Sequence, residues 1–120
     1  MDPSIIFQEL KREYKNGAAE RLSQIACSLD QLELEPSDNK ALKNLMRYFY
    51  GLSGTGATYG FPQVTVLGLQ GENECEALLK KNLSPKSCDL ERWRIYLLAL
   101  QGEFSKVESC YTEPLQEIDV

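Results

Sequence analysis

The chain has 120 residues, of which 42% are hydrophobic and 26% charged, a balance typical of one soluble globular domain. Its formal net charge of −5 argues against a nucleic-acid partner, because phosphate binding requires clustered Lys and Arg. The absence of histidine removes the commonest general base and metal ligand, and no apolar run is long enough to span a membrane. Because residues 1–4 lack the features of a secretory signal, we expect a cytoplasmic protein without metal or cofactor.

The four cysteines are widely spaced and form no Cys-x-x-Cys pair, so a zinc site is not indicated. They are Cys27, Cys75, Cys88 and Cys110. Cys75 falls on an apolar helical face and is expected in the core, and we expect all four to be inert thiols.

The first periodic segment runs from Ser4 to about Leu32, with an apolar face that repeats at helical spacing. Asn16-Gly17 interrupts it and is typical of a helix end. Two alternatives stay open. The pair splits the segment into two helices, or the glycine is tolerated inside one helix at a cost of about 1 kcal/mol.

Residues 35–39 form a loop that ends in helix-capping residues, and a helix with apolar positions from Leu42 to Leu52 follows. Gly60-Phe61-Pro62 predicts a break, because glycine ends helices and proline opens them. A further helix runs from Pro62 to about Asn82. Gly68 and Gly71 lie on its apolar face, which predicts close approach of a neighbouring helix.

The last helix repeats apolar residues at alternating three and four, from Leu90 through Trp93 to Val107, and Trp93 is expected in the core. Four amphipathic helices with short connections predict an all-α fold, an antiparallel four-helix bundle with an N-terminal helical extension. We assign residues 1–110 to the bundle. Residues 111–120, which hold three acids and a proline, are expected to form a tail or linker.

The stretch from Tyr48 to Pro62 carries a resemblance to a known family. It resembles the signature of histidine phosphotransfer (HPt) domains, His-x-Leu-Lys-Gly-Ser followed by small residues, and the helix order agrees over residues 38–107. Tyr50 stands where the family has its phosphoacceptor histidine. Ser53 stands at the family's lysine, and Gly54 at its glycine. Tyr50 and Gly54 are four apart, so they share one helix face.

The resemblance implies docking of a receiver domain of a response regulator, in a two-component phosphorelay, onto the face around Tyr50. The residues expected on this surface are Lys43, Arg47, Tyr50, Ser53, Gly54 and Ala57. Gly54, Gly56 and Ala57 are expected to keep it open. Lys43 and Arg47 are either solvated charges or partners of the acidic rim of a receiver. Tyr50 is either a boundary aromatic in a packing role or a recognition residue.

Phosphotransfer itself is not expected. It needs an imidazole that is nucleophilic at neutral pH. The hydroxyl of a tyrosine has an ordinary pKa of about 10, so little of it is ionised at pH 7. The sequence therefore favours a non-catalytic HPt-like docking module. One alternative is an active phosphotransfer domain in which Tyr50 replaces the histidine by substitution. Another is a helical assembly domain that dimerises through the Leu90–Val107 seam or the N-terminal helix, and the sequence leaves the oligomeric state open.

Overall fold

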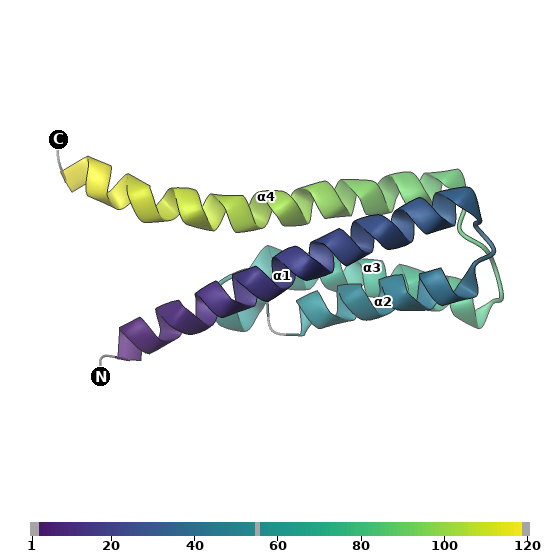
Figure 1. Cartoon of the computed structure of the whole chain (residues 1–120), viewed down its shortest axis with the longest axis horizontal. Coiled ribbons are helices and arrows are strands. Elements are labelled where there is room, and N and C mark those ends of the chain that lie inside the picture. The colour runs from purple at the N-terminus through teal and green to yellow at the C-terminus, as the bar shows by residue number, and fades with distance from the viewer. Residues whose placement is uncertain (1–2, 55, 119–120) are drawn as a thin grey trace.

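The computed structural model describes the backbone of residues 3–54 and 56–118 and, within these, side chains up to Ser105. In this part of the chain the fold is all-α, as predicted, and no helix combines the length and apolarity that a membrane crossing requires. The helices are α1 (Pro3–Leu34), α2 (Asn39–Ser53), the short 3₁₀ helix η1 (Ala57–Tyr59), α3 (Pro62–Lys80) and α4 (Ser87–Ile118). Figure 1 shows α1 to α4 running alternately up and down as a four-helix bundle.

Helix α1 is continuous from Pro3 to Leu34, so the second alternative for Asn16-Gly17 is correct. A side chain at Gly17 would meet nothing within 4 Å, which means that the glycine is not required by packing. The apolar face continues across it, since Tyr14 is half-buried and Ala18 is buried. The first turns of α1 extend beyond the ends of α2 and α3 and form the predicted N-terminal extension (Figure 1).

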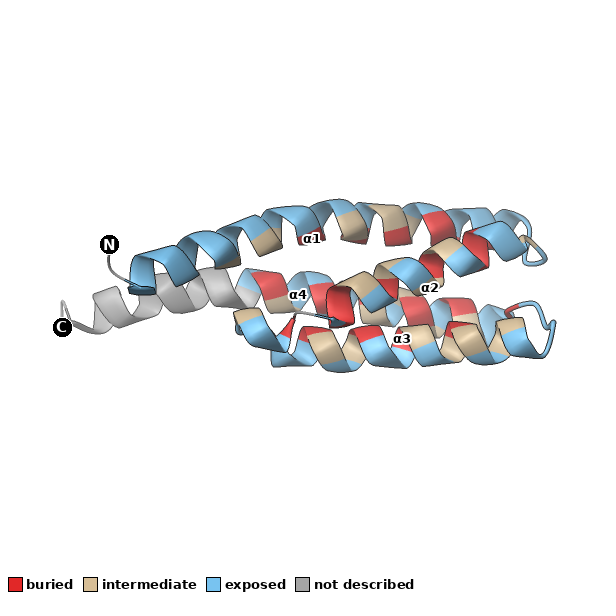
Figure 2. Cartoon of the chain, turned by 90° about the horizontal axis from the view of Figure 1, so that it is seen from below, coloured by how far each residue is buried: buried red, intermediate tan, exposed pale blue. Residues whose placement is uncertain are grey.

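The core follows the apolar seams that the sequence predicts, and buried residues line the inward faces of the helices (Figure 2). Trp93, Phe49 and Phe61 are the largest fully buried side chains, and Cys75 is buried with them. On α4 the buried positions are Leu90, Trp93, Leu97, Leu100 and Phe104, whereas the side chain of Val107 lies outside the described residues. This placement confirms Cys75 and Trp93 as core residues.

The helix ends also follow the predicted signals. Asp38 precedes α2, and its carboxylate accepts a hydrogen bond from the backbone N–H of Ala41 at 3.1 Å. Gly60 has φ of 88°, the left-handed conformation that glycine adopts without strain, and Pro62 opens α3. The turn at Gly60-Phe61-Pro62 therefore ends one helical segment and begins the next.

The boundary proposed at residue 110 falls inside α4, which continues to Ile118. The side chains of residues 106–120 lie outside the described part of the chain, Cys110 among them. The division into a bundle of residues 1–110 and a tail of residues 111–120 stays a prediction.

Candidate functional site

One face of α2 points away from the core and carries four of the residues expected at the docking surface. Lys43, Arg47, Tyr50 and Gly54 are spaced by four, three and four residues, and all four are exposed. Tyr50 is 61% exposed, while its neighbour Phe49 is fully buried. The helix thus turns the phenol outward and the phenylalanine inward.

The charge of this face differs from that of the whole chain. Helix α2 contains Lys40, Lys43 and Arg47 and no acidic residue, although the chain has a net charge of −5. All three cations are exposed. The result is a basic surface with an aromatic residue beside it on an otherwise acidic protein, an arrangement suited to an acidic protein partner.

Gly54 leaves open space on this face. It has helical backbone angles, φ −61° and ψ −35°, and a Cβ atom there would meet only the carbonyl oxygen of Tyr50, at an ordinary 3.6 Å. Ala57, in η1, is exposed as well, and its backbone N–H donates to Oγ1 of Thr65 at 2.8 Å. A larger residue at Gly54 is therefore sterically permitted in this chain and would obstruct only a partner.

Ser53 and Gly56 do not lie on the exposed face. The predictions that Ser53 belongs to the docking surface and that Gly56 keeps it open are therefore wrong. Ser53 is 6% exposed, and its hydroxyl donates to the carbonyl of Tyr50 at 2.8 Å. Gly56 is buried, and a Cβ atom there would lie 2.8 Å from Oγ1 of Thr65. Thr65 also donates to the carbonyl of Ser53 at 3.1 Å. The start of α3 covers this side of the α2 terminus, which turns both residues inward.

The close approach of α2 and α3 depends on Gly68 and Gly71, as predicted. A Cβ atom at Gly68 would lie 2.7 Å from the carbonyl oxygen of Phe49 and 2.9 Å from Cβ of Ser53. At Gly71 it would lie 2.5 Å from the Phe49 ring. Because Phe49 and Ser53 face these glycines, Tyr50 is held on the outside of the helix pair.

A second polar cluster lies between α3 and α4 and was not predicted. The carboxylate of Glu74 accepts hydrogen bonds from Nε of Arg92 (2.8 Å), Nε1 of Trp93 (2.9 Å) and the hydroxyl of Tyr96 (2.8 Å). Burial and the hydrogen bond to Glu74 raise the pKa of Tyr96. A buried indole N–H needs a hydrogen-bond acceptor. The expected burial of Trp93 was therefore the sequence signal that could have indicated a polar partner at this position. The cluster joins two helices and contains no reactive group.

The cysteines show no arrangement for chemistry in the described residues. Cys27 and Cys88 are exposed, and Cys75 is buried. Burial, together with the charges of Glu74 and Asp89, raises the pKa of the Cys75 thiol far above its usual range, which suppresses thiolate reactivity. Among these residues no group of three or more His, Cys, Asp and Glu side chains is placed to hold a metal ion.

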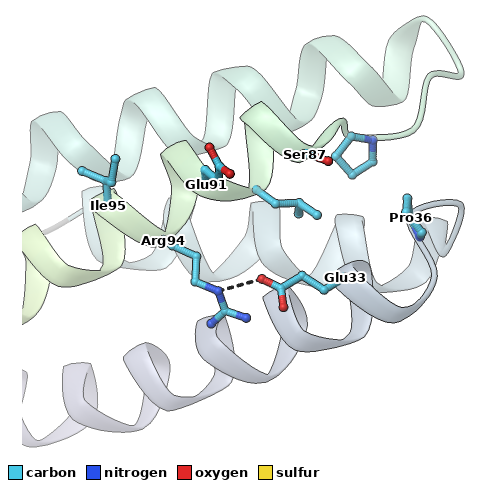
Figure 3. Close-up of a pocket in the computed structure, with 8 residues that line it drawn as sticks. Glu33, Pro36, Ser87, Glu91, Arg94 and Ile95 are labelled. Atoms are coloured by element: carbon cyan, nitrogen blue, oxygen red, sulfur yellow. Dashed lines mark hydrogen bonds and ion pairs between the residues drawn. The ribbon is translucent and has the colours of Figure 1, made fainter.

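An open groove of about 660 Å³ lies between the end of α1 and the start of α4 (Figure 3). It also escaped the sequence analysis, because its residues come from two distant segments of the chain. Arg94 crosses from α4 to α1, where Nε donates to Glu33 at 2.9 Å and Nη2 donates to Asp30 at 2.5 Å. None of the residues of the exposed α2 face lines this groove.

Comparisons with protein-family models, with curated proteins and with solved structures each found no match to this chain.

Proposed function

We propose that this chain is a non-catalytic, HPt-like signalling module that docks the receiver domain of a response regulator through the outward face of α2. The observation that carries the proposal is the place of Tyr50. It stands at the family's acceptor position, is 61% exposed, and shares its helix with three cations and no acid. The phosphorylation site of a receiver has an acidic rim, so the charges are complementary.

The surroundings of Tyr50 support docking without phosphotransfer. Transfer in the family uses a histidine, with a lysine that places the phosphoryl oxygens. This chain has no histidine, and Ser53, at the lysine position, is buried with its hydroxyl bonded to the carbonyl of Tyr50. Ser53 therefore offers no replacement for the lysine. What remains at the surface is Tyr50, the two cations Lys43 and Arg47, and the open position at Gly54.

Binding of purified receiver domains to Gly54→Arg tests this surface. Gly102→Arg, on the exposed side of α4, is the matched control, because a Cβ atom at Gly102 meets nothing within 4 Å and one at Gly54 makes only an ordinary 3.6 Å contact. We expect Gly54→Arg to weaken binding at least about tenfold, since a bulky side chain at the centre of an interface blocks its core. The control should bind like the wild type. Equal binding by the two variants, or a wild type that binds no receiver, contradicts the proposal.

An active phosphotransfer domain with a substituted acceptor is a second candidate, favoured by the solvent access of position 50. Tyr50→His, supplied with a phosphorylated receiver, decides between the two. Rapid appearance of acid-labile phosphate on the variant supports the second candidate. A variant that binds the receiver and gains no phosphate supports docking alone.

Self-association is a third candidate, because four large apolar residues in the first turns of α1 are about half exposed. They are Ile5, Ile6, Phe7 and Leu10, with exposed fractions from 43% to 52%. If α1 forms a dimer, Leu10→Glu will lower the mass measured by sedimentation. The control Leu34→Glu, at the opposite end of α1 and 89% exposed in the wild type, will leave the mass unchanged. A wild type that is monomeric over the whole concentration range excludes this candidate.

A further inference from the structure

The groove between α1 and α4 has an apolar base and an apolar edge. Leu90 is 7% exposed and lies at its base, whereas Ile95 is 63% exposed, a large fraction for an aliphatic side chain. Pro36 and Pro85, one from each connecting loop, also line it. Figure 3 shows Ile95, Glu91 and Arg94 along the start of α4, and Glu33 and Pro36 around the end of α1. The remaining lining residues are Glu33, Ser87, Glu91 and Arg94.

The groove is acidic. Its only lining cation is Arg94, which already binds Glu33 and Asp30 of α1. Those hydrogen bonds raise the pKa of Arg94, so the guanidinium stays charged and paired. Glu91 is exposed and adds a further negative charge, so the three charged residues that line the groove carry a net charge of −1. Phosphate groups and anionic lipids are disfavoured here, and cations are favoured.

The positive end of α4, at the rim of the groove, is already neutralised. The Asp89 carboxylate accepts a hydrogen bond from the backbone N–H of Lys86 at 2.8 Å and pairs with Arg92 at 2.7 Å. An anion therefore gains little from the helix dipole at this site. Lys86, between Pro85 and Ser87 in sequence, is not among the residues that line the groove.

We propose that this groove binds a basic amphipathic segment of a partner protein. An apolar side chain of the segment contacts Leu90 and Ile95, and Lys or Arg side chains one turn away meet Glu91 and Glu33. The shape supports a peptide, because an open groove with an exposed isoleucine at its edge offers an apolar contact and a charged rim together, as helix-binding grooves do. This site is separate from the α2 face, whose charge has the opposite sign.

Fluorescence anisotropy with a labelled amphipathic peptide of leucine, alanine and lysine tests the proposal. Two pairs of variants separate the groove from general attraction to an acidic protein. Glu91→Lys is matched by Glu20→Lys, an equal change of charge at an exposed position on α1. Ile95→Ser is matched by Leu98→Ser, which removes a side chain 66% exposed on the same helix but outside the groove. All four positions are exposed, so we expect each variant to retain the fold.

We expect Glu91→Lys and Ile95→Ser each to weaken peptide binding about tenfold, and the two controls to change it less than about twofold. Equal loss in Glu91→Lys and Glu20→Lys would mean nonspecific charge attraction and overturn the proposal. Wild-type affinity in Ile95→Ser, or no saturable binding to the wild type, would overturn it as well. Receiver binding at the α2 face is measured separately, so the failure of either proposal is distinguishable from failure of the other.

Discussion

Replacing Gly68 by alanine tests the close contact that fixes Tyr50 on the outside of α2. The new Cβ would lie 2.7 Å from the carbonyl oxygen of Phe49 and 3.0 Å from the backbone nitrogen of Ser53, so relief requires a movement of backbone. Overpacking of this kind costs about 1–3 kcal/mol. Against this, alanine gains up to about 1 kcal/mol over glycine inside a helix. The expected net effect is a loss of about 1–2 kcal/mol.

Gly102→Ala is the matched control, because it makes the same chemical change inside α4 with no atom within 4 Å of the new Cβ. It should stabilise the protein by up to about 1 kcal/mol. Urea unfolding followed by far-ultraviolet circular dichroism measures both. The two midpoints should move in opposite directions and stand about 0.5–1.5 M apart, with m near 2 kcal/mol/M. Midpoints that shift together in the same direction would refute the argument that α2 and α3 are in backbone contact at Gly68.

Three further outcomes follow from the polar contacts and the cysteines. Glu74→Gln should lower stability by about 1–3 kcal/mol and shift the fluorescence of the single tryptophan, because it removes the charged acceptor of Trp93, Arg92 and Tyr96. In mass-spectrometric mapping, Cys75 should resist alkylation in the native protein while the exposed Cys27 and Cys88 react, and Cys75 should react once the chain is unfolded; equal native rates would contradict its burial. Burial would raise the pKa of Asp89, but the backbone N–H of Lys86 and the guanidinium of Arg92 hold that pKa below its ordinary value. Asp89 therefore contributes to stability above about pH 4, and this contribution is lost as the pH falls through the lowered pKa. The stability gap between wild type and Asp89→Asn should therefore be largest near neutral pH and close in acid, and a gap that stays constant in acid would exclude this linkage.

The sequence predicts the fold well, since each strong local signal agrees with its tertiary surroundings. The seam from Leu90 to Phe104 is buried, Asp38 caps α2, and Pro62 opens α3 after the left-handed Gly60. Asn16-Gly17 shows the limit of a local signal. One glycine costs about 1 kcal/mol, and an apolar face that continues on both sides of it offsets that cost.

The candidate site was predicted only in part. Helical spacing is enough to place Lys43, Arg47, Tyr50 and Gly54 on one exposed face. Ser53 lies four residues after the buried Phe49, so the spacing within α2 places it on the inward face, and it was the family resemblance that assigned it to the docking surface. The burial of Gly56 depends on Thr65, from α3, and no periodicity within α2 contains that information. The contacts of Arg94 with Asp30 and Glu33 join residues more than sixty positions apart, so they follow from the packing of α1 against α4.

The measurement that tests docking on the α2 face most directly is hydrogen exchange of the chain with and without a bound receiver domain. Docking at the exposed face predicts that the bound receiver slows amide exchange in residues 43–57. Exchange in residues 87–95, at the start of α4, should stay unchanged. Protection confined to the start of α4, or to the first turns of α1, would contradict the proposed docking surface.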